Sequence, residues 1–210
     1  MKNIKYILLL LAVMFQLPVI AQNVDADALL DKVAANIKAD SPVRMDYSYM
    51  VCDDDGELLQ SDKGVIYIDN SRYALLMQDM KVWCDGATQW SYMREIDEIY
   101  ITDASSDEAQ NLSPLYIVEC YRDGYGASLL DKGSAWMVEL KAADDEADVE
   151  KVELLITKND NRLVQMLVYM PGQGCIDVEL DGYVPACGAG IQTFECPLEE
   201  FAGVEVIDMR

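Results

Sequence analysis

The 210-residue sequence contains no histidine. Histidine is the commonest general base near neutral pH, so its absence excludes Ser-His-Asp and Cys-His catalytic arrangements and histidine-ligated metals. The sequence also has no P-loop and no G-x-G-x-x-G motif. Its many carboxylates fall mainly in loops and at outward-facing strand positions, which favours solvated surface over paired catalytic acids. We therefore expect a protein that is not an enzyme and needs neither a cofactor nor a metal.

Basic residues are scarce. There are 16 lysines and arginines against 38 aspartates and glutamates, a formal net charge of -22. This charge disfavours binding to nucleic acid or to anionic lipid headgroups, because both would be repelled. It leaves open whether the acidity serves solubility alone or matches a basic partner surface.

Long apolar runs are absent except at the N-terminus. Lys2 and Lys5 precede an apolar run that ends near Ala21, the layout of a secretory signal peptide. We expect cleavage after residue 21, which leaves 14 basic and 38 acidic residues and a net charge of -24. An uncleaved anchor is the alternative, but the run is short for a membrane span. Residues 22–210 are expected to form one domain.

The six cysteines include no C-x-x-C pair, so neither a thioredoxin-like motif nor a zinc site is indicated. An exported chain permits disulfides, but six cysteines allow 15 pairings and the sequence does not choose among them. Free buried cysteine is the alternative for each.

The periodicity of apolar residues predicts one helix followed by many short strands. Residues 25–39 carry apolar side chains at helical spacing, with Asp25 or Asp27 as the cap. Alternation from Val43 to Val51 predicts a strand with an apolar inner face, and similar short strands follow at close spacing. Ser113 and Pro114 mark the start of a second, strongly apolar helix.

Residues 80–93 are expected to form a hairpin with Asp85, Gly86 and Ala87 in its loop. That loop sets Val82 opposite Trp90 and places Trp90 and Tyr92 on one apolar face. In this register Cys84 faces inward and Cys52 faces outward, so a Cys52–Cys84 bridge is not favoured.

These elements together predict a mainly β, α+β fold: a strongly curved antiparallel half barrel of about 10–11 strands with helices on its concave side. The aromatic and methionine side chains on the inner face either line a ligand cavity or pack as an ordinary core.

Three blocks of sequence resemble the periplasmic lipoprotein carrier family LolA, particularly its relatives from Bacteroidetes-type bacteria. The strand Tyr47–Val51 precedes a G-x-[LIV]-x-[LIV] strand at 64–68, and D-G-x-x-x-W-x-Y stands at 85–92. Residues 194–208 resemble the family's terminal F-x-F followed by G-V-x-V-x-D.

The resemblance implies a half barrel with a helical lid that carries the acyl moiety of lipoproteins through the periplasm. The implied partners are the acylated cargo, a LolCDE-like inner-membrane export complex and an outer-membrane acceptor; we expect a monomer. The expected cavity residues are Met45, Tyr47, Tyr49, Val82, Trp90, Tyr92, Trp136 and Val138. The expected lid residues are Leu115, Ile117 and Val118.

One position departs from the family pattern. A basic residue followed by proline usually comes after the G-x-[LIV]-x-[LIV] strand and latches the lid, whereas this chain has Asn70-Ser71 there. We expect Asn70 or Arg72 to replace the latch. Two other functions compete with the carrier: a regulatory protein of the same shape that senses lipid or envelope stress, and a purely structural domain with a filled core.

Overall fold

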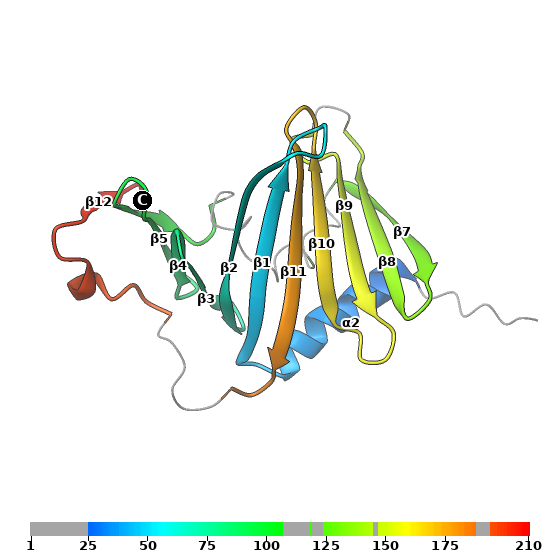
Figure 1. The fold of residues 1–210 in the computed structure, drawn as a ribbon. Helices are drawn as coiled ribbons and strands as arrows, with labels where there is room; N and C mark the ends of the chain where they lie inside the picture. Colours follow the sequence, from blue (N-terminus) through cyan, green and yellow to red (C-terminus); the bar gives the residue numbers. More distant parts are fainter. Residues whose placement is uncertain (1–24, 107–117, 119–123, 145–146, 188–193) are drawn as a thin grey trace, which may run out of the picture.

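The computed structural model describes residues 25–106, 118, 124–144, 147–187 and 194–210. Its strands form a single twelve-stranded sheet in the order β12-β6-β5-β4-β3-β2-β1-β11-β10-β9-β8-β7. The sheet is open and curved, and helix α2 lies across one of its faces (Figure 1). Among the described residues, no helix is long and apolar enough to cross a membrane.

Two meanders build the sheet, and their first and last strands meet at its centre. The N-terminal meander follows α2 (Ala26–Ala39) and consists of β1 (Val43–Cys52), β2 (Leu58–Asp69), β3 (Arg72–Met77), β4 (Met80–Cys84), β5 (Thr88–Met93) and β6 (Glu98–Asp103). The C-terminal meander consists of β7 (Tyr125–Lys132), β8 (Ala135–Ala142), β9 (Lys151–Thr157), β10 (Leu163–Met170) and β11 (Gly174–Val184). A 3-10 turn (Leu198–Phe201) and β12 (Glu205–Asp208) complete the chain, and β12 pairs with β6 in parallel.

Helix α2 confirms the predicted N-terminal helix. The Asp25 carboxylate accepts a hydrogen bond from the Asp27 backbone N–H at 3.2 Å and caps the first turn. The predicted apolar stripe is buried along the helix, with Leu29, Leu30 and Val33 each at most 1% exposed. A stripe at this spacing covers one face of a helix, so α2 presents that face to the sheet.

The stripe of α2 packs into the main hydrophobic core, which we call the concave cluster. Strand residues enter it at every second position, as the pleat of a sheet requires. The buried members are Ala26, Leu29, Leu30, Val33, Ala34, Ile37, Val43, Met45, Ile66, Ile68, Tyr73, Leu75, Met77, Val82, Cys84, Val118, Val138, Leu140, Val152, Leu154, Ile156, Leu163, Met166, Val178 and Leu180. The expected curved antiparallel sheet with a helix on its concave side is therefore confirmed, with β12 as an added parallel strand.

The predicted register of the 80–93 hairpin is wrong by one residue. Trp83, not Val82, lies opposite Trp90, and Cys84 lies opposite Gln89. The loop holds two residues, Gly86 and Ala87, because the Asp85 N–H bonds to the Thr88 carbonyl at 3.2 Å. Gly86 has a φ of +95°, which the first position of such a tight loop favours. A shift of one residue moves side chains to the opposite face.

This register creates a second apolar cluster on the other side of the sheet, which we call the outer cluster. Its buried members are Ala74, Trp83, Ile99, Ile101 and Cys196, and the half-buried residues packed against them are Tyr67, Leu76, Trp90, Tyr92, Phe194, Phe201 and Val204. The C-terminal segment 194–204 supplies its cover, and the segment continues into β12 beside β6 (Figure 1).

Candidate ligand-binding surface

Six of the eight predicted cavity residues lie on the concave side of the sheet. Met45, Val82 and Val138 are buried members of the concave cluster, at most 3% exposed. Tyr47, Tyr49 and Trp136 are half-buried and pack against that cluster. The structure thus places these six in or against one apolar cluster on the concave side of the sheet.

Tyr47 and Tyr49 form an aromatic pair on β1. Their ring centroids lie 6.2 Å apart with the rings tilted by 52°. Burial, and to a smaller extent the neighbouring Tyr49, raises the pKa of Tyr47 to about 12. The Tyr49 hydroxyl accepts a hydrogen bond from the Gln60 side-chain amide at 2.8 Å. The concave surface therefore carries neutral aromatic rings at physiological pH.

Trp90 and Tyr92 do not belong to this surface, which corrects the prediction for both residues. They pack in the outer cluster, and the Tyr92 ring lies 4.7 Å from the ring of Phe201. The polar side chains of Gln89 and Ser91 take the opposite face of β5, directly across from Cys84 and Val82. The wall that the hairpin gives to the concave cluster is thus partly polar, with Gln89 donating to the Ser91 hydroxyl at 3.2 Å.

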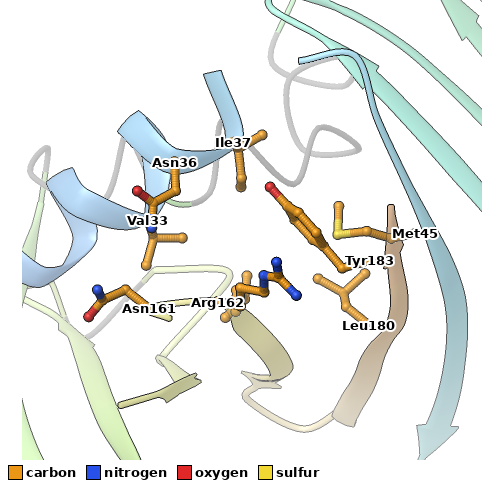
Figure 2. A pocket seen from close by; sticks show the side chains of 9 residues that line it. Val33, Asn36, Ile37, Met45, Asn161, Arg162, Leu180 and Tyr183 are labelled. Atoms are coloured by element: carbon orange, nitrogen blue, oxygen red, sulfur yellow. The ribbon is translucent and has the colours of Figure 1, made fainter. Parts of the chain in front are cut away.

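A narrow cavity of about 10 Å³ lies beneath the C-terminal half of α2 (Figure 2). A space of this size holds about one water molecule. Its apolar lining comes from Val33, Ile37, Met45, Leu163 and Leu180, and its polar lining from Asn36, Asn161, Arg162 and Tyr183. At this place the C-terminal half of α2 therefore lies directly against the sheet.

A wider opening of about 170 Å³ adjoins this cavity beside the β9–β10 turn. Arg162 stands at the junction, since it lines both spaces. Its guanidinium lies over the Tyr183 ring, 4.1 Å from the centroid, and its Nε lies 3.3 Å from an Asp160 carboxylate oxygen. Arg162 and Tyr183 thus place a cation and an aromatic ring where the two spaces meet, and we call this place the mouth of the cavity.

Polar contacts hold the C-terminal end of α2 to the sheet. The Tyr183 hydroxyl donates to the Asp40 carboxylate at 2.9 Å, and the Asn36 side-chain amide donates to the Asp160 carbonyl at 3.2 Å. Burial, followed by the bond to Asp40, raises the pKa of Tyr183, so its hydroxyl keeps the proton that it donates. Because Asp40 caps α2, the side chain of Tyr183 fixes that end of the helix to β11.

These mouth residues were not predicted as site residues. Arg162 and Asn161 lie in the turn before β10, and Tyr183 lies near the end of β11. The strand order brings them beside α2 from more than 120 residues away in sequence, since Tyr183 and Asp40 are 143 positions apart. The sequence carried no local signal for this proximity.

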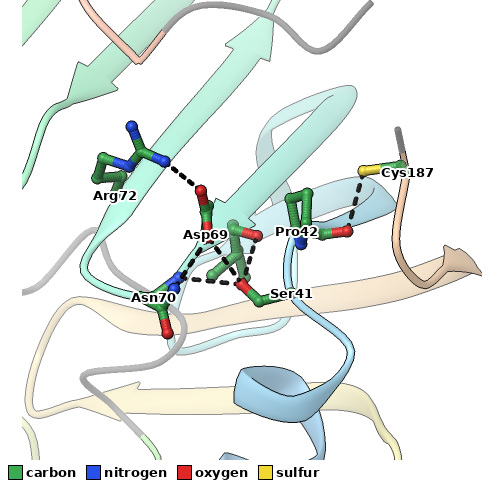
Figure 3. Close-up of polar contacts among 7 residues, drawn as sticks. Ser41, Pro42, Asp69, Asn70, Arg72 and Cys187 are labelled. Atoms are coloured by element: carbon green, nitrogen blue, oxygen red, sulfur yellow. Dashed lines mark hydrogen bonds and ion pairs between the residues drawn. The ribbon is translucent and has the colours of Figure 1, made fainter. Parts of the chain in front are cut away.

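Of the proposed latch residues, Asn70 lies in the β2–β3 turn and Arg72 begins β3 (Figure 3). Asn70 donates its backbone N–H to the Ser41 hydroxyl at 3.1 Å and its side-chain amide to Asp69 at 3.0 Å. Arg72 pairs with the Asp69 carboxylate and lies 4.8 Å from the centre of the Phe194 ring. Asn70 thus fastens the segment that follows α2, whereas Arg72 contacts the C-terminal segment.

The predicted lid residues fall mostly outside the described part of the chain. Leu115 and Ile117 lie outside it. Val118 is described: it is helical, 1% exposed and part of the concave cluster. The latch role of Asn70 or Arg72 toward this lid stays a prediction.

The fold and this surface together define a class of protein, an open β half barrel whose apolar concave face is covered by a helix. Residues 17–167 match the model of the family described as outer membrane lipoprotein carrier protein LolA. Because the match covers well over half of the chain, the protein belongs to this family.

Solved structures share the fold at low sequence identity. An uncharacterized conserved protein from Thermus thermophilus has a TM-score of 0.51 at 14% identity, with 87% of this chain and 98% of that chain covered. A structure of MucB has a TM-score of 0.53 at 15% identity, covering 87% of this chain and 65% of that one. The MucA/MucB complex of Pseudomonas aeruginosa has a TM-score of 0.50 at 15% identity, covering 83% and 62%. This chain spans less than two thirds of the length of those MucB chains. A sequence comparison with curated proteins finds no match.

Proposed function

We propose that the protein binds the acyl chains of lipoproteins on its concave surface and carries them through the periplasm from the inner to the outer membrane. The observation that supports this most is the apolar cover of the sheet: α2 contributes a continuous apolar stripe to the concave cluster, and the tyrosine pair of β1 packs against the same cluster. The proposed role is binding rather than catalysis. Its expected partners are a LolCDE-like export complex and an outer-membrane acceptor.

The physical need for such a cover follows from the cargo. Each methylene of an acyl chain costs about 0.8 kcal/mol to expose to water, so several chains cannot cross an aqueous compartment unprotected. The cavity of about 10 Å³ beneath α2 is too small for an acyl chain. We expect cargo to displace α2, so that the apolar residues that the helix covers contact the chains in its place.

The two tyrosines that the sequence placed on one wall provide a matched test. Tyr47 and Tyr92 are both half-buried, but Tyr47 packs against the concave cluster and Tyr92 in the outer cluster. We expect Tyr47→Gln to weaken the binding of a synthetic triacylated lipopeptide several-fold and Tyr92→Gln to leave it unchanged. Co-elution of the lipopeptide in gel filtration measures both, and circular dichroism confirms that each variant is folded. Equal losses in both variants would contradict the proposed surface.

The transport role is tested in cells. Depletion of the protein is expected to make lipoproteins accumulate in the inner membrane, measured by membrane fractionation. Lipid extracted from the protein purified from its own envelope is expected to include triacylated lipoprotein. Unchanged lipoprotein localisation would remove the carrier role.

A second candidate function is a periplasmic regulatory protein that senses lipid or envelope stress through a protein partner. It is favoured by the structural likeness to MucB, a protein solved in complex with MucA. Recovery of a stoichiometric protein partner without bound lipid, together with normal lipoprotein localisation after depletion, would select this function over the carrier.

A further inference from the structure

Two cysteines face each other across the seam between the two meanders. Cys52 ends β1, Cys175 lies at the start of β11, and the antiparallel register pairs them directly. This pair closes the ladder that joins the N-terminal half of the sheet to the C-terminal half. Both cysteines are partly exposed and unbridged in the structure.

The backbone around the pair is held close. Gly174 precedes Cys175 with a φ of +85°, and a Cβ added at Gly174 would lie only 2.0 Å from the Cys52 carbonyl oxygen. Only glycine permits this approach, since any other residue would push β11 away from β1. Directly opposed residues of an antiparallel pair have Cα atoms about 4.5 to 5.5 Å apart, within the range that a disulfide spans.

The other described cysteines have no such partner. Cys84 is buried in the concave cluster and Cys196 in the outer cluster, so the sheet separates these two. Cys187 donates its S–H to the Pro42 carbonyl at 3.2 Å. Within the described ranges, Cys52 and Cys175 form the one cross-strand cysteine pair; Cys120 lies outside those ranges.

We propose that Cys52 and Cys175 form a disulfide in the exported protein and so staple the two meanders together. The sequence alone did not choose among the 15 possible pairings of the six cysteines. The strand register selects this bond. The inference concerns the stability of the sheet and does not depend on the carrier function.

The reaction requires an oxidant, which we take to be a low-molecular-weight or protein disulfide. One cysteine thiolate attacks a sulfur of the donor, which releases one donor thiol and leaves a mixed disulfide. The second cysteine then attacks the sulfur of the first, and the other donor thiol leaves. The donor gains two electrons and two protons, and the protein loses them. Burial, followed by the neighbouring Cys52 thiol, raises the pKa of Cys175, so the uncatalysed exchange is slow at neutral pH.

The bond would close a loop that contains most of the sheet. Closing a long loop lowers the conformational entropy of the unfolded chain and stabilises the folded one. Because the staple lies at the far end of β1 from the α2 attachment, it leaves the helix free to move while the strands beneath stay paired.

Peptide mapping of the full chain, exported in its own host and alkylated before lysis, tests the pairing. Trypsin leaves Cys175, Cys187 and Cys196 on one peptide, because no lysine or arginine lies between Leu163 and Met209. A second cleavage after acidic residues separates them at Glu179 and Glu195. The expected product is a reducible Cys52–Cys175 cross-linked peptide; both cysteines found alkylated, or Cys175 joined to another cysteine, would overturn the proposal.

Unfolding measurements provide a second readout. Oxidation of the purified protein with glutathione disulfide is expected to raise its guanidinium midpoint, and reduction is expected to lower it again. Cys52→Ser and Cys175→Ser should each abolish this redox shift, whereas Cys187→Ser, which keeps a hydroxyl donor toward Pro42, should preserve it. A shift that persists in the Cys52→Ser variant would contradict the staple.

Discussion

The concave cluster and the outer cluster lie on opposite faces of the same strands, but they are covered in different ways. α2 covers the concave cluster through one apolar stripe and polar contacts at its C-terminal end. The segment 194–208 covers the outer cluster through edge-on and tilted aromatic contacts of Phe201 and then joins the sheet itself as β12. The cover of the outer cluster is thus hydrogen-bonded into the sheet, whereas α2 packs on the sheet without joining its strands.

The two clusters also differ in size and in polar character. The outer cluster has five buried members, and the Trp83 indole N–H there has no hydrogen-bond partner among the described residues. The concave cluster extends over both meanders, and its half-buried rim carries the tyrosine pair of β1. Under the proposed function, the outer cluster serves stability and the concave cluster serves both stability and binding.

The largest expected effect on stability comes from truncating a side chain in the apolar stripe of α2. Leu30 is fully buried, so Leu30→Ala leaves a cavity and is expected to lower the free energy of unfolding by about 2 to 5 kcal/mol. Urea unfolding followed by circular dichroism measures the change. Lys32→Ala, an exposed change in the same helix, serves as the control. Equal stability of the two variants would show that α2 does not belong to the cooperative unit.

A pH titration tests the burial of Tyr47 on the concave side. Its folded pKa of about 12 lies above the unfolded value of 10.0, so the folded state favours the neutral form. The contribution of neutral Tyr47 to the free energy of unfolding is fully present below pH 10. It falls by up to about 2.5 kcal/mol as the pH rises toward 12. The difference in unfolding free energy between wild type and Tyr47→Phe should narrow or reverse across this window. A constant difference from pH 9 to pH 12 would mean that Tyr47 is solvated.

The outer cluster should respond in stability alone. Phe201 is half-buried, meets the Trp83 ring edge-on and lies tilted against the Tyr92 ring, so Phe201→Ala is expected to lower the free energy of unfolding by about 1 to 2 kcal/mol. Lipopeptide binding by the folded variant is expected to stay at the wild-type level. Leu198→Ala, at a residue 42% exposed in the same segment, is the control for stability. Reduced lipopeptide binding in folded Phe201→Ala would mean that the outer cluster also contributes to the cargo site.

The smallest expected effect concerns the fastening of α2. Tyr183→Phe removes one hydrogen bond to Asp40, which is worth about 1 kcal/mol. If opening of α2 limits uptake, the variant should bind lipopeptide faster, as followed by stopped-flow fluorescence of a labelled lipopeptide. Tyr100→Phe, which removes a hydroxyl bonded to Glu98 on β6, should leave the rate unchanged.

Features that depend on local pattern were predictable from the sequence. The α2 stripe and the alternation of β1 each follow from residues close together in the chain, and each is confirmed. The sequence left the helix cap open between Asp25 and Asp27, and the structure places it at Asp25. The family motifs added the half barrel, which is confirmed, and the lid, which stays a prediction. The buried positions of Met45, Val82 and Val138 followed from the same alternation.

Features that depend on one hydrogen bond or on distant strands were not predictable. A three-residue loop and a two-residue loop both suit Asp-Gly, and only the Asp85–Thr88 backbone bond decides between them. The apolar Trp83 was the sign of the correct register, because it stood on the polar face of the wrong one. The mouth at Arg162 and Tyr183 exists only because β11 lies beside β1.

That central pairing also constrains the time course of folding. β1 is among the first segments of the domain and β11 is near its end, so their ladder forms only after a long loop closes, and such pairings fold slowly. If the chain enters the periplasm from its N-terminus, the apolar side chains of β1 and α2 stay exposed to water until β11 is available to pair with β1. We expect a chain truncated before residue 174 to retain this exposed apolar surface and to aggregate. The proposed carrier of apolar cargo would thus itself need protection from aggregation during its synthesis and export.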